Sequence, residues 1–187
     1  GTVTSPKGFK AGSVFAGLKT PGADKRDVGI ILSDVPCSIA GVFTQNKVAA
    51  APVIISRERI KRGIGRGIVF IAGNANAATG EVGLQRAKQM AELAAARFGV
   101  SPDDLMVAST GVIGVPLPIE KFQDGIERVE ISYDGGHDAA QCIITTDTRK
   151  KEAAIEVSNG EWSFRIGAIA KGAGMIHPNM ATMLCFV

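Results

Sequence analysis

Short runs of β-branched and aromatic residues, each bounded by turn-forming residues, limit what this chain of 187 residues can fold into. None of the runs approaches the roughly 20 residues that a membrane span requires, and no charged-then-apolar leader opens the chain. They alternate with two stretches in which apolar residues recur every three or four positions, the spacing of an amphipathic helix. The alternation predicts a single α/β domain over residues 1–187.

The predicted strands share β-branched or aromatic side chains and a turn residue at either end. They cover residues 28–33, 40–44, 52–56, 67–72 and 105–109, with one short strand in the loop-rich stretch 1–22 and a hairpin of 152–157 and 162–170 about Asn159-Gly160. Helical spacing predicts helices over 83–98, stopped by Gly99, and over about 119–129, started by Pro118. Shorter helices are expected at 56–63, with Ser56 as N-cap and Gly63 past the end, and around 138–141.

Composition narrows the classes of partner. Lys plus Arg is 21 and Asp plus Glu is 18, and the chain has one Trp, one Tyr and eight Phe, so neither a basic surface nor aromatic platforms for nucleic acid are expected. Three scattered cysteines encode no disulfide framework or zinc site. His137 and His177 have no other metal ligand at suitable spacing, so no metal is predicted. A reducing compartment, the cytoplasm, follows from the cysteine pattern.

Polar residues among small neighbours mark the candidate chemistry. Ser109-Thr-Gly-Val-Ile-Gly114 follows a predicted strand, and its Thr110 and Gly111 fall in a tight turn where N–H groups and a hydroxyl can converge on an anion. From these residues alone, an ordinary strand-end turn is the favoured interpretation. The small-polar loop 73–80 is interpreted as a packed turn with side-chain caps, and the cluster Thr145-Thr-Asp-Thr148 is uninformative by itself.

The stretch 171–187 carries the strongest signal. Small residues follow Lys171, Pro178-Asn179 bends the chain, and Thr182 opens an apolar run. A Thr held after a strained turn can attack the carbonyl of the preceding residue, here Ala181. The released α-amino group, with an ordinary pKa of about 7.7–8.0, can then act as the base for its own hydroxyl. The plain alternative is a loop that feeds a core strand.

Together with Ser5-Pro-Lys-Gly-Phe9 and Gly73-Asn-Ala-Asn-Ala77, these motifs resemble the ornithine acetyltransferase (glutamate N-acetyltransferase) family of bifunctional arginine biosynthesis proteins. The match runs in order along nearly the whole chain, and its most specific part is the block 171–184. The resemblance implies an α/β (α+β) sandwich of mixed sheets flanked by helices. It also implies a self-processing enzyme of the N-terminal-nucleophile type whose fold is completed by a β chain.

The resemblance further implies cleavage between Ala181 and Thr182, which divides the chain into an α chain, 1–181, and the start of the β chain, 182–187. Thr182 then matches the catalytic nucleophile, Thr110 and Gly111 match the oxyanion pair, and Thr145, Lys171 and Thr182 match substrate-binding positions. The implied reaction passes acetyl from N2-acetylornithine to glutamate in a ping-pong cycle without a cofactor. Acetyl-CoA as a second acetyl donor stays open. The implied partner is the protein's own β chain, in an assembly of two α and two β chains.

Two other functions stay open at this stage. A self-processing amidase or aminopeptidase would use the same nucleophile but let water accept the acyl group. A non-catalytic binding or scaffold domain would not need Thr182 at all.

Overall fold

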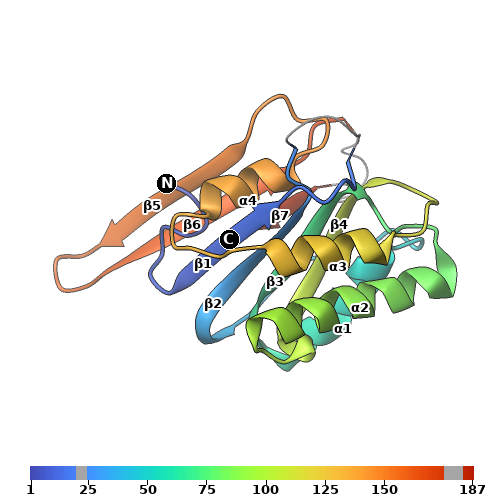
Figure 1. The fold of residues 1–187 in the computed structure, drawn as a ribbon. Coiled ribbons are helices and arrows are strands. Elements are labelled where there is room, and N and C mark those ends of the chain that lie inside the picture. Colours follow the sequence, from blue (N-terminus) through green and yellow to red (C-terminus); the bar gives the residue numbers. More distant parts are fainter. Residues whose placement is uncertain (20–24, 175–182) are drawn as a thin grey trace.

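A four-stranded sheet, here called the central sheet, organises the computed structural model, which describes residues 1–19, 25–174 and 183–187 (Figure 1). Its strands lie in the order β1 (Phe9–Val14), β2 (Val28–Ser38), β3 (Ile64–Asn74) and β4 (Leu105–Val112). The first three strands pair antiparallel, whereas β3 and β4 are parallel. Parallel neighbours need a crossover connection, and the long helix between them provides it.

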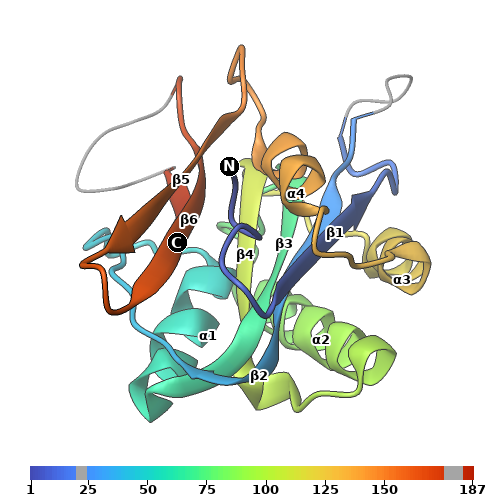
Figure 2. The same ribbon diagram turned by 90° about the vertical axis from the view of Figure 1, so that its left-hand side faces the viewer.

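Helices cover both faces of the central sheet (Figure 2). They are α1 (Ala51–Arg59), α2 (Gly80–Phe98), α3 (Ile119–Arg128) and α4 (Gly136–Ile143), with 3₁₀ turns at Ile60–Arg62 and Pro102–Asp104. The first three helices pack on one face, and α4 packs on the other. In the described parts of the chain, no helix has both the length and the apolar character needed to cross a membrane.

A second, antiparallel sheet, the outer sheet, consists of β5 (Lys151–Ser158), β6 (Ser163–Lys171) and β7 (Leu184–Phe186). It joins the core on the α4 side, where buried Ile169 and the partly buried Phe186 pack in the same cluster as Phe70 of β3. The rings of Phe70 and Phe186 lie with their centroids 5.4 Å apart. The expected mixed α/β architecture with two sheets is therefore confirmed.

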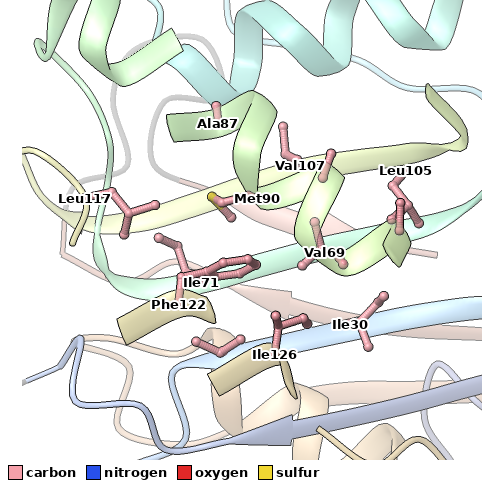
Figure 3. Close-up of a cluster of buried hydrophobic side chains, with 14 of the residues drawn as sticks. Ile30, Val69, Ile71, Ala87, Met90, Leu105, Val107, Leu117, Phe122 and Ile126 are labelled. Atoms are coloured by element: carbon pink, nitrogen blue, oxygen red, sulfur yellow. The ribbon is translucent and has the colours of Figure 1, made fainter. Parts of the chain in front are cut away.

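Strand alternation divides the core between the two faces. Val69 and Ile71 of β3 point toward α2 and α3, where they meet Phe122 and Met90 (Figure 3). Phe70, between them, points to the α4 side. Successive side chains of a strand face opposite ways, and here both faces are covered. This explains why 67–72 reads as a continuous apolar run.

Two predicted strands are wrong. Residues 52–56 lie inside α1, and residues 40–44 have no regular structure. The β-branched run Val53–Ile55 suggested a strand, but Pro52 lies at the first turn of the helix, and the buried Ala51, Ile55 and Ser56 share one face. Packing of that face against the sheet overrides the weak local preference of β-branched residues.

The other predicted elements agree with the structure to within a few residues. The helix expected at 56–63 is the end of α1 and the following 3₁₀ turn, and Gly63 stops it with φ of 69°. Ser56 is not an N-cap, because it lies inside α1, and its hydroxyl bonds instead to both backbone groups of Val107. The cluster Thr145–Thr148 follows helix α4.

Candidate active site

The carboxyl ends of β3 and β4 form the base of the site. Thr110 lies opposite Ala72, and Gly111 lies opposite Gly73. Gly111 has φ of 136°, and a Cβ there would lie 2.2 Å from the carbonyl carbon of Gly73, so only glycine fits. The tight turn predicted at Thr110 and Gly111 is wrong, because both residues lie within β4, which runs on to Val112.

Lys171 meets Thr110 across the two sheets. Lys171 is the last residue of β6, is 3% exposed, and donates from Nζ to Thr110 Oγ1 at 2.9 Å. Because the hydroxyl oxygen accepts this bond, the hydroxyl hydrogen of Thr110 stays available to another acceptor. Two of the expected site residues, 61 positions apart, are thus in direct contact.

The buried carboxylate of Asp147 interacts electrostatically with Lys171. Burial lowers the pKa of Lys171, Asp147 opposes that effect, and the like charge of Lys151 adds to it. Asp147 accepts hydrogen bonds from the backbone N–H of Gly172, at 2.9 Å, and from Lys151 Nζ. Burial raises the pKa of Asp147, but these donors outweigh it and hold the pKa below its ordinary value.

A groove of about 1750 Å³ opens beside the Lys171–Thr110 pair. Thr110, Gly111, Thr145, Lys171 and Met183 all line it. Its described lining has no aspartate or glutamate but has six basic residues: Lys19, Lys25, Arg66, Lys121, Arg165 and Lys171. The groove therefore favours a ligand with negative charge.

A strap of residues 16–19 borders the groove next to Gly73. The buried Asp27 carboxylate holds it by accepting backbone N–H bonds from Ala16, Leu18 and Lys19 at 2.6, 2.7 and 3.0 Å. Lys19 Nζ in turn donates to the carbonyl oxygens of Arg26 and Cys142, at 2.7 and 2.8 Å, and burial lowers its pKa. No local sequence pattern predicts this strap, since its backbone N–H groups bond to the Asp27 carboxylate and its Lys19 amine bonds to the carbonyls of Arg26 and Cys142, which become neighbours only in the folded chain.

The loop 73–80 is a capped turn, as predicted. Asn74 Oδ1 accepts from the backbone N–H of Asn76 at 2.7 Å, and Asn74 Nδ2 donates to the carbonyl of Val115 at 3.0 Å. The side chain of Asn76 bonds to Thr79 and to the carbonyl of Gly83. These bonds fix the loop that connects β3 to α2 beside the site.

Ala181, Thr182 and His177 lie outside the described residues, although Met183, which follows Thr182, lines the groove. His137 is exposed and bonds to Glu152 at 2.9 Å. Across 1–19, 25–174 and 183–187, no three potential metal ligands gather, and the three cysteines are free thiols.

Comparison with solved structures defines the class of fold. The crystal structure of an arginine biosynthesis bifunctional protein from Bacillus halodurans covers 97% of this chain and 95% of its own, with 39% identity and a TM-score of 0.89. An ornithine acetyltransferase from Mycobacterium tuberculosis, solved with ornithine, covers 96% of each chain with 36% identity and a TM-score of 0.89.

Sequence comparison is more specific. The model of the ArgJ family matches residues 10–187, and the chain belongs to this family. Arginine biosynthesis bifunctional proteins of Symbiobacterium thermophilum and Dehalococcoides mccartyi are 51% and 48% identical over all of this chain. The chain spans about half the length of these curated relatives, 47% and 46%.

Proposed function

We propose that this chain is the α-chain portion of a self-cleaving acetyltransferase that moves acetyl from N2-acetylornithine to glutamate in arginine biosynthesis. The observation that carries the proposal is the Lys171–Thr110 contact beside Gly111, at the wall of a groove with basic and no described acidic lining. Membership of the ArgJ family supports it, as does the ornithine complex of the Mycobacterium tuberculosis relative.

In the proposed maturation step, the hydroxyl of Thr182 attacks the carbonyl carbon of Ala181. The acyl group shifts from nitrogen to oxygen, water hydrolyses the resulting ester, and Thr182 gains a free α-amino group. Cleavage leaves residues 1–181 as the α chain and places 182–187 at the start of the β chain.

In the proposed transfer, Thr182 Oγ attacks the acetyl carbonyl of N2-acetylornithine, and its proton passes to the leaving nitrogen through the α-amino group. The C–N bond breaks, ornithine departs, and the acetyl group remains on Thr182 as an ester. The amine of glutamate then attacks this ester, the C–O bond breaks, and Thr182 Oγ recovers its proton.

The described residues take two roles in this scheme. Thr110 and Gly111 stabilise the oxyanion that forms in each attack, because donors fixed in a water-poor site favour the charged transition state over the neutral ester or amide. Lys171 and Thr145, with Thr182, bind the substrate and its carboxylate. The free hydroxyl hydrogen of Thr110 and the basic lining of the groove agree with these roles.

The proposed partner is the protein's own β chain, in an assembly of two α and two β chains. The curated relatives extend to about twice the length of this chain, which leaves room for such a β portion. Ile155, Phe164 and Ile166 of the outer sheet are 58, 47 and 39% exposed and offer an apolar surface for it. We further propose a cytoplasmic enzyme without a resident cofactor, with acetyl-CoA to be tested as a second donor.

Peptide mapping tests the proposal directly. Mature enzyme given N2-acetylornithine without glutamate is expected to accumulate acetyl on the peptide that begins with Thr182. Acetyl found only on lysine or cysteine would refute the covalent route. Free acetate released without glutamate would indicate an amidase instead.

Matched variants at the junction separate cleavage from folding. Thr182→Ala is expected to yield one uncut polypeptide by intact mass, because an N-to-O shift needs a hydroxyl. Thr182→Ser keeps the hydroxyl and is expected to yield two chains. Two chains of unchanged mass from Thr182→Ala would rule out self-cleavage at this bond.

Thr110→Ala tests the oxyanion role in the fully cleaved fraction. Loss of one oxyanion donor usually lowers kcat by about 10²–10³, and KM is expected to change little because the lost bond belongs to the transition state. Thr110→Ser keeps the hydroxyl and serves as the control. An unchanged kcat in Thr110→Ala would remove the side chain from the oxyanion site.

A further inference from the structure

Asp147 is a buried carboxylate to which the proposed chemistry gives no task. Its side chain is 0% exposed. One oxygen, Oδ1, accepts from Gly172 N and from Lys151 Nζ, whereas Oδ2 is buried and has no hydrogen-bond partner among the described residues. A buried carboxylate with an unpaired oxygen costs free energy, so its presence beside the site calls for a compensating role.

The first connection to Lys171 runs through the backbone. Gly172 directly follows Lys171 and has φ of 151°, which lies in the range that glycine adopts most easily. Asp147 Oδ1 accepts a hydrogen bond from the N–H of Gly172 at 2.9 Å, and Lys171 itself pairs with Leu184 of the neighbouring strand β7. The peptide that carries Lys171 is therefore fixed at both ends, and its Nζ reaches Thr110 Oγ1.

The second connection is electrostatic. Three charged groups in the described parts of the chain act on the Lys171 amine: Asp147 before β5, Lys151 at the start of β5, and Lys19 in the strap. Burial, which has the largest effect, lowers the pKa of Lys171. Lys151 lowers it further, and Lys19 repels the same charge. Asp147 alone among these groups favours the protonated amine.

We propose that Asp147 is a positioning residue, which fixes the Lys171–Gly172 peptide and supplies the negative charge that keeps the proton on Lys171 while its amine contacts Thr110. This inference rests on the proposed function, because it gives the cationic Lys171 its substrate-binding task. Asp147 acts through Lys171 and touches neither the substrate nor the reacting atoms.

The test compares three variants of the full-length, cleaved enzyme by the pH dependence of kcat/KM. In Asp147→Asn the amide oxygen can still accept from Gly172 but the charge is gone, so Lys171 loses its proton at lower pH and the alkaline limb moves to lower pH. In Lys151→Gln a like charge is removed, so the alkaline limb moves to higher pH. Asp103→Asn changes a side chain that is 70% exposed and precedes β4, at the end of the strand opposite Thr110, so it leaves the limb in place.

A titration that needs no activity accompanies the profile. With ¹³C-labelled lysine, the Lys171 signal is assigned by its absence in Lys171→Arg, and its pKa is measured in each variant by NMR. We expect it to fall in Asp147→Asn and to rise in Lys151→Gln. If kcat/KM falls in Asp147→Asn while both the alkaline limb and the Lys171 titration stay in place, Asp147 is a structural cap only and the inference is overturned.

The outcomes for the two proposals are distinguishable. Parent enzyme that fails to transfer acetyl contradicts the proposed function, whereas the NMR titration still decides the electrostatic role of Asp147. If Asp147→Asn does not fold, Lys151→Gln decides, because the change is at a half-exposed side chain. An unmoved Lys171 titration in Lys151→Gln would then overturn the inference.

Discussion

The central and outer sheets differ in how far their apolar side chains are exposed to solvent. In β3 of the central sheet, Val69, Phe70 and Ile71 are all 0% exposed, because helices cover one face and α4 with the outer sheet covers the other. In the outer sheet, Phe164 and Ile166 of β6 are open to solvent along with Ile155 of β5.

The same difference in exposure is found within the single strand β6. Its first half, Ser163–Ile166, is exposed, whereas Gly167, Ile169 and Lys171 in its second half are buried against the rest of the molecule. In β6, therefore, the half that ends at Lys171, next to Thr110, is the part packed against the rest of the described chain. The outer sheet therefore places Lys171 next to the central sheet, and the exposed half of the outer sheet contributes little to the stability of this chain.

The largest contrast is expected from a matched pair of phenylalanine truncations. Phe122→Ala removes a fully buried ring from the core between α3 and the central sheet, which costs about 3–5 kcal/mol. Phe164→Ala removes a ring that is 47% exposed, and its cost is expected below about 1 kcal/mol. Urea unfolding measures both. Equal costs would mean that a partner covers the outer sheet in the sample.

Two glycines with positive φ form the next pair. Gly111→Ala in the central sheet combines the strain of an unfavourable φ, about 1–3 kcal/mol, with a clash against the backbone of Gly73. Gly160→Ala in the β5–β6 hairpin has φ of 93° but open space around it, so only the conformational cost of about 1–2 kcal/mol applies. Unfolding midpoints check the order. Equal losses would show that the β3–β4 contact can relax.

Two serines, one beside an edge strand of the central sheet and one in an edge strand of the outer sheet, allow the contribution of their hydrogen bonds to stability to be compared. The hydroxyl of Ser56 donates to the carbonyl of Val107 at 2.7 Å and accepts from its N–H at 2.9 Å, covering the open edge of β4. Ser56→Ala leaves both groups unpaired and is expected to cost about 1–3 kcal/mol. Ser158→Ala loses one exposed bond to Gly160, and a change within about 0.5 kcal/mol is expected. Similar values for both would contradict the structural role of Ser56.

The smallest effect concerns cysteine reactivity rather than stability. Burial raises the pKa of Cys142, on the α4 side of the central sheet, to about 12. It therefore remains a neutral thiol around neutral pH, while the exposed Cys185 of β7 is accessible to reagent. At pH 8 a thiol reagent is expected to label Cys185 first and Cys142 only after unfolding. Cys185→Ser serves as the control, and rapid labelling of Cys142 in the folded protein would show that the core opens.

Much of the fold was predictable because it depends on local patterns. The spacing of apolar residues and the stop at Gly99 placed α2 within three residues of its observed start, and Asn159-Gly160 placed the hairpin. The wrong strand at 52–56 has a physical cause. The run Val53–Ile55 has a β-branched composition, and only the neighbouring sheet and α2 decide that it becomes a helix.

The site was predictable only through its motifs. The motifs identify Thr110 and Lys171 as separate residues. Their contact at 2.9 Å depends on where the end of β6 lies relative to β4, which no spacing along the chain reveals. Asp147 lies within the motif Thr145–Thr148, but the motif does not show its proposed role. That role depends on its hydrogen bonds to Gly172 and Lys151, which form only in the folded chain.

The pairing of β7 with β6 has a consequence for a polypeptide that is cut between Ala181 and Thr182. Leu184, Cys185 and Phe186 pair with Lys171, Ala170 and Ile169, so the new terminus begins two residues before a strand already bound to the other fragment. Phe186 also packs against Phe70. A cut at this bond therefore leaves β7 paired with β6, so the two fragments stay associated at the high effective concentration of a tethered pair and do not have to find each other by diffusion.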